Sequence, residues 1–288
     1  MTPSEIHGLG LTTPLTQDQL PYDDGVPMES QRHNQQMGLL IDALLPWLDQ
    51  REDGFIGGNM FVYYSMRQVR NQDFRGPDFF AVLGVPKGER KSWVCWEEER
   101  TPDLVIELLS DSTREVDKGE KKQIYQNQLH VSEYFWYDPF DSNDFAGFRL
   151  QGGIYQDIPF TASEKLISQV LDLSLVRWQG SYKGTEAVWL RWANLNGRLL
   201  LTYEEQEHQQ AEQERQRAEQ ERQRAEQERQ RAEQERDRAE QERDRADRAE
   251  AQVLQIARSL LQIGMEEQQI AQTTGLSIEQ IRTLISDR

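Results

Sequence analysis

The hydrophobic and polar positions divide the chain into a first part with mixed periodicity and a second part with helical periodicity alone. In the first part, apolar residues recur at helical spacing over 30–48 and again over 113–127. Short apolar runs typical of strands stand on either side of the second helix, at 103–109 and 133–137. A strand–helix–strand crossover of this kind predicts an α/β arrangement. Further strand-like runs lie at 59–64, 78–85, 92–96, 145–155 and 173–192.

The second part of the chain begins near residue 203, where the composition changes abruptly. Every Trp, Tyr and Phe lies at or before Tyr203, and no Lys follows it. From Ala211 a seven-residue repeat, Ala-Glu-Gln-Glu-Arg-Gln-Arg, continues to about Arg245, which predicts a helix of ~40 residues and roughly 60 Å. The repeat offers Ala at one core-type position and Glu, as in Glu214, at the other. Both a solvated single helix and a weak, Ala-seamed oligomerisation stalk fit this pattern.

The last segment regains an apolar stripe at helical spacing. Gly264 interrupts the stripe, and a second short helix is expected over 266–273. Ser277 and Gln280 have the spacing of a capping box that starts a third helix. Two short helices joined by a Gly-containing turn resemble a helix-turn-helix motif, whose groove-facing candidates are Gln280, Arg282 and Thr283. A small helical cap or dimer contact is the alternative, because residues 251–288 have a net charge of −1.

These boundaries predict three parts: a folded domain over 1–203, a charged heptad-repeat helix over 204–250 and a small helical segment over 251–288. We expect an α/β core with a mixed sheet, followed by a long C-terminal helix and a small helical end. The 288 residues include 50 acidic and 33 basic residues. No apolar stretch approaches the ~20 residues of a membrane span, so we expect a soluble cytoplasmic protein without membrane contact. Cys95 is the only cysteine and, between Trp93 and Trp96, is expected to pack in the core.

One acidic residue, Glu107, interrupts the apolar run over 103–109. A strand this hydrophobic is expected to be covered on both faces, where an unpaired carboxylate costs several kcal/mol or becomes neutral. A cation is therefore expected near Glu107, and Lys121, on the following helix, is the candidate side chain. A second carboxylate, Asp78, lies on a neighbouring strand-like run. Asp103 is a poorer candidate than Asp78 for sharing a site with Glu107, because four residues of extended strand place it about 13 Å from Glu107.

Two carboxylates and a lysine from neighbouring elements suit the hydrolysis of a phosphodiester bond. That reaction needs an activated water and neutralisation of the negative charge that grows on the phosphate oxygens. A carboxylate-held Mg²⁺ or Mn²⁺ supplies both, and a lysine can position the water or stabilise charge. The sequence therefore predicts a metal site formed by Asp78 and Glu107, with Lys121 as a catalytic residue. The structural alternative is a plain ion pair of Asp78 or Glu107 with Lys121.

This arrangement resembles the PD-(D/E)XK nuclease superfamily, and more closely its restriction-endonuclease branch called the Uma-two family. The resemblance covers roughly residues 15–200 and implies a restriction-endonuclease-like core. It also implies a metal-dependent endonuclease with Asp78 and Glu107 as metal ligands and Lys121 as the catalytic lysine. One departure is that Leu109 stands where the superfamily places a lysine, two residues after the glutamate, so the role passes to Lys121. The residues that carry the resemblance are Pro77-Asp78, Glu107-Leu108-Leu109-Ser110, Ser112-Thr113-Arg114, Asp117, Glu120-Lys121, Tyr125, Glu133-Tyr134-Phe135-Trp136 and Asp138-Pro139.

Four further residues are candidates for a supporting role. Glu29 and His33 open the first helix, where related nucleases sometimes place an extra metal-coordinating acid; a favourable charge at the helix start explains Glu29 equally well. Asp117 lies four residues before Lys121, which predicts a local ion pair. Tyr125 shares the helical face of Lys121 and either supports the site or packs in the core.

The charge of the first part argues against general attraction to nucleic acid. Residues 1–203 hold 19 basic and 29 acidic residues, a net charge of −10, whereas nucleic-acid binding favours a basic face. DNA is nevertheless the expected substrate, as the resemblance to restriction endonucleases implies. The alternatives are a catalytically silent nuclease fold, used as a scaffold and assembled into a homo-oligomer through residues 204–288, and a DNA-binding protein that uses the helices over 265–286.

Overall fold

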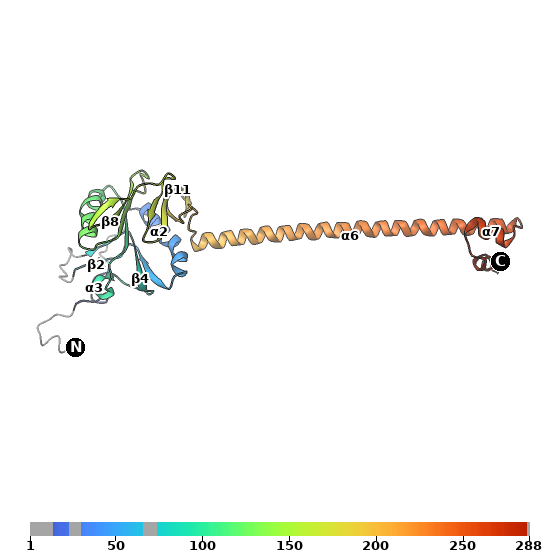
Figure 1. Ribbon diagram of the computed structural model, residues 1–288, viewed down its shortest axis with the longest axis horizontal. Helices are drawn as coiled ribbons and strands as arrows, with labels where there is room; N and C mark the ends of the chain where they lie inside the picture. Colours follow the sequence, from blue (N-terminus) through green and yellow to red (C-terminus); the bar gives the residue numbers. More distant parts are fainter. Residues whose placement is uncertain (1–13, 23–29, 66–73, 287–288) are drawn as a thin grey trace, which may run out of the picture. The chain divides into compact units, whose positions relative to one another are not determined.

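The structure is a computed structural model that describes residues 14–22, 30–65 and 74–286, and it divides into two compact units, 1–209 and 210–288. The expected α/β fold with a mixed sheet, a long C-terminal helix and a small helical end is confirmed. The first unit contains the sheets, the helix α2 and several short helices (Figure 1).

A six-stranded sheet forms the centre of the first unit, in the order β1-β4-β6-β7-β8-β9. The pair β6–β7 is parallel and its other pairs are antiparallel, so the carboxyl ends of β6 and β7 meet at one edge. Its strands are β1 (Asp53–Gly57), β4 (Phe79–Pro86), β6 (Leu104–Leu108), β7 (Glu133–Tyr137), β8 (Phe145–Gln151) and β9 (Ile154–Asp157).

Two small sheets and a set of helices complete this unit. One sheet has the order β10-β11-β12 and the other β3-β2-β5. Their strands are β2 (Val62–Tyr63), β3 (Phe74–Arg75), β5 (Trp93–Val94), β10 (Leu166–Ser168), β11 (Leu173–Tyr182) and β12 (Thr185–Ala193). The helices are α2 (Gln31–Asp49), α3 (Cys95–Glu98), α4 (Arg114–Val116), the π-helical turn η1 (Asp117–Lys121) and α5 (Lys122–Asn127).

Strand β6 is buried on both faces, as its apolar sequence predicts. Leu104, Ile106 and Leu108 pack in a core that α2 and the β10-β11-β12 sheet share. Val105 points to the other face, into a core that includes side chains of α5. Side chains alternate along a strand, so Glu107 faces the same side as Val105 and is directed toward α5.

Helix α2 begins at a regular cap and is fixed to the second sheet by a buried glutamine. Ser30 is the N-cap, and its Oγ accepts a hydrogen bond from the amide of His33. The side-chain amide of Gln36 donates to the carbonyl of Leu190 at 2.8 Å and accepts from the amide of Leu190 at 2.9 Å. This two-way bond satisfies a buried polar side chain and sets the position of the helix against β12.

Several elements differ from the expected pattern. The run over 92–96 is a strand only at Trp93–Val94 and then turns into α3, and the run over 145–155 is a hairpin with a glycine turn between β8 and β9. Strands β1, β3 and β10 were not predicted, because their short runs lack clear alternation. The expected helix over 113–127 contains the π-helical turn η1, which apolar periodicity does not reveal.

The C-terminal part of the chain is helical. Helix α6 (Tyr203–Gln262) is one uninterrupted helix of 60 residues, longer than the heptad repeat indicates (Figure 1). It is followed by α7 (Glu267–Thr274) and α8 (Ile278–Ser286), and the predicted break at Gly264 is confirmed by its positive φ of 82°. A small core joins the three helices through Ala257, Ile270 and Ile281. Within the described part of the chain, no helix is long and apolar enough to cross a membrane.

Candidate active site

Asp78 and Glu107 lie next to each other on neighbouring strands. In the antiparallel pair β4–β6, Phe79 is opposite Ile106, and the same register continued by one residue sets Asp78 opposite Glu107. The Leu108 amide donates a hydrogen bond of 2.7 Å to Oδ2 of Asp78. Besides the larger effect of burial, the charge of Asp78 contributes to the raised pKa of Glu107. The sheet itself therefore brings these two acids together.

The helix after β6 supplies three further side chains from one face. Residues four apart share a helix face, and Asp117, Lys121 and Tyr125 have this spacing. Lys121 Nζ lies 2.7 Å from Oδ1 of Asp117 and 3.1 Å from Oε2 of Glu107. The Tyr125 hydroxyl donates a hydrogen bond of 2.6 Å to Oε1 of Glu107.

The π-helical turn η1 spans the stretch from Asp117 to Lys121. A π-helical turn widens the helix locally, and such turns occur frequently at functional sites. The carbonyl of Asp117 accepts a hydrogen bond of 2.9 Å from the hydroxyl of Tyr134, a residue of β7. This bond fixes the wide turn against the sheet beneath it, and with it the position of the Lys121 side chain.

Burial and mutual repulsion set the charge state of these groups. Glu107 is fully buried, and burial raises its pKa to about 8, with Lys121 lowering it in part while Asp78 and Asp117 add to the increase. Burial also raises the pKa of Asp78, against the opposing effect of Lys121. Burial by itself would lower the pKa of Lys121, but the surrounding acids outweigh it and raise the pKa, so the ammonium stays protonated.

The cluster holds three acidic groups and one basic group, and two oxygens in it, Oε2 of Glu107 and Oδ1 of Asp117, accept no hydrogen bond from the described residues. Three carboxyl groups, those of Asp78, Glu107 and Asp117, surround the single ammonium of Lys121. Oε2 of Glu107 is within ion-pairing distance of that ammonium but accepts no hydrogen bond from any described residue. A buried carboxylate oxygen without a donor is costly in a folded protein. The plain ion pair with Lys121 therefore exists, yet it leaves both the excess of acidic groups and Oε2 of Glu107 unexplained.

This donor set fits a hard divalent cation. Mg²⁺ prefers oxygen ligands and is often bound through one or two carboxylates together with water and substrate phosphates. Among the described residues, no three His, Cys, Asp or Glu side chains converge into a complete metal cage. A pair such as Asp78 and Glu107 would therefore leave positions for water and phosphate, as a catalytic site requires.

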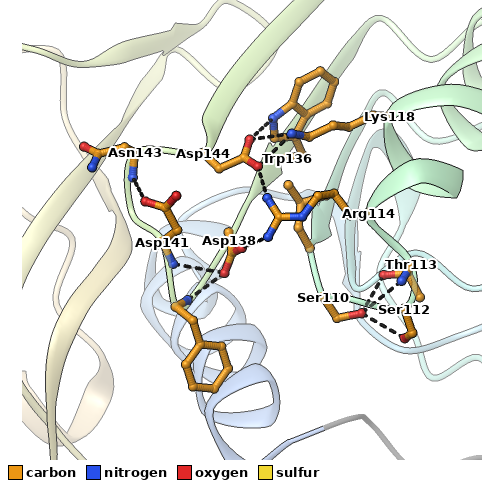
Figure 2. A network of polar contacts seen from close by, with 12 residues as sticks. Ser110, Ser112, Thr113, Arg114, Lys118, Trp136, Asp138, Asp141, Asn143 and Asp144 are labelled. Carbon is orange, nitrogen blue, oxygen red and sulfur yellow. Dashed lines mark hydrogen bonds and ion pairs between the residues drawn. The ribbon is translucent and has the colours of Figure 1, made fainter.

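A second polar network holds the start of the same helix to the loop after β7 (Figure 2). Arg114 pairs with both Asp138 and Asp144, and Lys118 Nζ lies 2.7 Å from Oδ2 of Asp144. Asp144 also accepts a hydrogen bond of 3.1 Å from the indole of Trp136. These contacts join α4 and η1 to the segment between β7 and β8, on the sheet edge where Glu107 lies.

Ser110, two residues after the end of β6, holds the following turn together through hydrogen bonds (Figure 2). Its hydroxyl is hydrogen-bonded to the hydroxyl of Thr113 at 2.9 Å and accepts a bond of 3.1 Å from the amide of Thr113. The hydroxyl of Ser112 lies 3.1 Å from it. The turn between β6 and α4 is thus closed by side-chain bonds, which limits how far the helix can move from the strand.

The remaining sequence candidates in the first unit have different surroundings. His33 is buried, and both ring nitrogens are occupied: Nε2 is 2.9 Å from the carbonyl of Leu109 and Nδ1 is 2.8 Å from the hydroxyl of Ser30. A ring with both nitrogens bonded in this way has no lone pair to offer a metal. Glu29 lies outside the described residues.

The candidate nucleic-acid contacts in the C-terminal helices all have partners within the chain. Gln280 and Ser277 form the predicted capping box, with bonds of 2.9 and 3.2 Å. Arg282 pairs with Glu267 at 3.1 Å, and the hydroxyl of Thr283 donates to the carbonyl of Glu279 at 2.9 Å. Of the three candidates, only Arg282 and Thr283 could contact a DNA groove without breaking the capping bonds between Ser277 and Gln280.

Sequence analysis did not assign roles to Arg114, Asp138 and Asp144. Arg114 and Asp138 belong to the motifs that carry the family resemblance, so a signal for them existed. Asp144 is separated from Arg114 by η1, α5, β7 and the loop that follows β7, and its part in the network depends on how β7 and β8 pair. Such a long-range contact leaves no local pattern in the sequence.

Two protein-family models and a solved structure match parts of the chain. Residues 15–178, more than half of the chain, match the family model Uma2, described as "Putative restriction endonuclease". Residues 250–286 match the C-terminal HTH domain of the "Rpn/YhgA-like nuclease family". A crystal structure of "a putative nuclease belonging to DUF820" from Anabaena variabilis is similar at a TM-score of 0.38 and 15% identity, over 55% of this chain and 91% of that one. No curated protein matches the chain.

Proposed function

The chain belongs to the Uma2 family, and from this membership we propose that it is a divalent-metal-dependent endonuclease that hydrolyses DNA phosphodiester bonds. One observation carries the proposal. Oε2 of the buried Glu107 accepts no hydrogen bond from the residues that the structure describes, and it belongs to a cluster of three acids and one lysine. A cation of charge +2 would balance that cluster and occupy that oxygen.

Asp78 and Glu107 are the residues that would hold the ion, Mg²⁺ or Mn²⁺. When bound, such an ion acts as a Lewis acid that lowers the pKa of a water molecule and offsets charge on the phosphate. Each carboxylate already has one oxygen fixed by the protein: the Leu108 amide holds Oδ2 of Asp78, and Tyr125 holds Oε1 of Glu107. These bonds orient the remaining oxygens before any ligand arrives, which is how surrounding groups tune a metal site.

Lys121 has the role of stabilising charge on the substrate. Its protonated ammonium can donate hydrogen bonds to a phosphate oxygen, and these bonds strengthen as negative charge grows during attack by water. The attacking water loses its proton to solvent or to a neighbouring carboxylate, and the leaving oxygen gains one from water. Asp117 is then a positioning residue, because its ion pair holds the lysine in place.

Cleavage of DNA by the purified full-length chain tests this function. Supercoiled plasmid and single-stranded DNA should both be tried with Mg²⁺ and with Mn²⁺, and a chelator should stop the reaction. Asp78→Ala and Glu107→Gln should abolish cleavage while circular dichroism shows an unchanged fold. Cleavage that persists in chelator, or in both variants, would refute the proposal.

A second candidate function, DNA binding through the C-terminal helices, is supported by the match of residues 250–286 to an HTH domain. The two functions are compatible, since a helix-turn-helix could direct a nuclease to its substrate. A chain that ends at Gln209 separates them: a nuclease in residues 1–209 keeps cutting, whereas binding that depends on α7 and α8 is lost. The same truncation tests the alternative of a silent scaffold, which would lose its assembly.

A further inference from the structure

An exposed aromatic ring and an arginine lie together near the sheet edge where β6 and β7 end. Phe140 follows β7, and 61% of it is exposed. The guanidinium carbon of Arg32, in the first turn of α2, lies 4.6 Å from the centre of the Phe140 ring. One exposed apolar side chain needs no explanation by itself. Three properties of this pair, its fixed position, its charge and its place near the carboxyl ends of β6 and β7, indicate a binding role.

The ring is presented by a turn whose position is fixed. Oδ1 of Asp138 accepts hydrogen bonds from the amides of Phe140 and Asp141, at 2.7 and 3.1 Å. The other oxygen of Asp138 pairs with Arg114. Arg32 contacts the same turn through the carbonyl of Pro139, at 3.5 Å. A rigid aromatic side chain loses little conformational entropy when a ligand stacks on it.

Arg32 differs in its charge balance from the other basic residues of this edge. Arg114 and Lys118 pair with aspartates, and Lys121 pairs with Glu107 and Asp117. Arg32 has no carboxylate within 4.0 Å among the described residues, and most of its five N–H donors have no partner there. It is therefore the basic side chain best able to bind a phosphate near the candidate site.

The backbone keeps this pair near the carboxyl end of β6, the strand that carries Glu107, although the Glu107 side chain itself points to the other face of the sheet, toward α5. In the parallel pair β6–β7, Glu107 is opposite Trp136, and Phe140 is four residues beyond Trp136, at most about 13 Å along an extended chain. His33, the residue after Arg32, bonds to the carbonyl of Leu109, two residues after Glu107. A strand of DNA rises about 3.4 Å per nucleotide in a duplex, so a few nucleotides span this distance.

We propose that Phe140 and Arg32 form a subsite for an unpaired nucleotide in a single-stranded segment of DNA. The base stacks on the exposed ring, and the guanidinium of Arg32 binds a phosphate of the same strand. A base inside a duplex cannot stack on such a ring without leaving its neighbours, whereas a single strand offers its bases freely. The net charge of −10 over 1–203 also disfavours a broad duplex-binding face. The inference rests on the proposed function for its choice of DNA.

Fluorescence anisotropy with the full-length chain tests the subsite. A labelled oligo-dT strand and a labelled hairpin duplex are titrated in a buffer with Ca²⁺, which replaces Mg²⁺ without supporting rapid cleavage. We expect tighter binding of oligo-dT than of the duplex. Phe140→Ala should weaken oligo-dT binding about 10-fold, the size of one lost stacking contact, and Phe140→Tyr should restore it.

The role of Arg32 is tested by the salt dependence of binding, with Arg51 as a matched control. Arg32→Ala should lower the salt dependence of oligo-dT binding by about 0.7 in log–log slope, the value of one lost phosphate contact on a single strand, and Arg32→Lys should keep it. Arg51 lies just beyond the other end of α2, stacks on Trp47 at 5.0 Å and pairs with Asp53 at 3.2 Å. Arg51→Ala, which also removes a stacked arginine, should leave both affinity and slope unchanged.

The outcomes separate this inference from the nuclease proposal. Equal oligo-dT affinity in Phe140→Ala and the parent chain, or no oligo-dT binding by the parent, would each overturn the subsite. If binding depends on Phe140 but no condition gives cleavage, the subsite stands and the nuclease proposal fails. If the chain cleaves DNA, and Phe140→Ala cleaves and binds DNA as well as the parent chain does, the nuclease proposal stands and the subsite fails.

Discussion

Two glutamates on neighbouring strands of the central sheet are both buried, yet their surroundings differ. Glu133, at the start of β7, has both carboxylate oxygens occupied: Arg149 and the amide of Gln169 bind Oε1 at 2.9 Å, and the Ser168 hydroxyl binds Oε2 at 2.5 Å. Glu107, near the end of β6, has one oxygen bound by Tyr125 and the other without a hydrogen bond. The first carboxylate is satisfied by the fold, and the second is not.

The difference shows how a structural acid can be told from a functional one. A buried charge that is fully paired and hydrogen-bonded holds parts of a fold together, even when it adds little net stability. A buried acid surrounded by other acids, with an unsatisfied oxygen, is a poor way to stabilise a fold and is typical of a site prepared for a ligand. We therefore expect the two glutamates to respond in opposite ways to the same substitution.

The largest effect is expected when each glutamate is changed to glutamine. Glu107→Gln should lower the cleavage rate on the order of 10³-fold and leave the melting temperature unchanged or higher. Glu133→Gln should keep the cleavage rate but lose about 2 kcal/mol of stability, because Arg149 loses a charged acceptor. Rate measurements and urea titrations of both variants check this. Equal losses of activity in the two would remove the distinction between them.

Lys121 should have the next largest effect. Lys121→Gln removes the only ammonium in the acid cluster, and cleavage should fall about 100-fold because charge on the phosphate is no longer balanced. Lys122 is the matched control: it is the next residue of the helix, but its Nζ lies 3.2 Å from the centre of the Phe148 ring. Lys122→Gln should stay within about threefold of the parent rate. A Lys121→Gln variant as active as Lys122→Gln would exclude a catalytic role.

Arg114 should affect the cleavage rate by positioning the turn that carries Lys121, without taking part in the reaction itself. Arg114→Gln removes the tether between α4 and the two aspartates of the β7–β8 segment, so the turn that presents Lys121 can shift. Small displacements of a catalytic group lower the rate markedly, and we expect a loss of about 10-fold in kcat with KM little changed. Arg90, which pairs with Glu98 at 2.6 Å, provides the control. If Arg90→Gln and Arg114→Gln lose the same activity, the tether has no special role.

The acid cluster also predicts how stability depends on pH. Glu107 has its pKa raised from the usual 4.5 to about 8, so between these values the folded chain holds a proton that the unfolded chain releases. The metal-free chain should lose stability as pH rises from about 5 to 8, by at most about 1.4 kcal/mol per pH unit. Thermal melts across this range should show a shallower decline for Glu107→Gln. An identical pH dependence in the variant would contradict the assigned environment.

The sequence predicted the central features of the fold because they depend on local patterns. The apolar run around Glu107 predicted a strand covered on both faces, and β7 (Glu133–Tyr137) has the predicted bounds. The spacing of Ser277 and Gln280 predicted a helix cap that the structure contains.

Features that depend on pairing could not be found in this way. Strand β1 is held by its long pairing with β4, and its own five residues do not alternate. The missing hydrogen bond at Glu107 and the bonds of His33 to Ser30 and Leu109 exist only because distant segments meet. Residue types indicated which side chains to consider for the site, whereas their partners required the three-dimensional structure.

Calorimetric titration of Mn²⁺ into the metal-free chain tests the central claim most directly. The account predicts one binding site per chain in the parent and in Glu133→Gln, and no binding at that site in Glu107→Gln or Asp78→Ala. Unchanged Mn²⁺ binding in Glu107→Gln would contradict it, because the unsatisfied oxygen of this buried acid would then have no part in holding the ion.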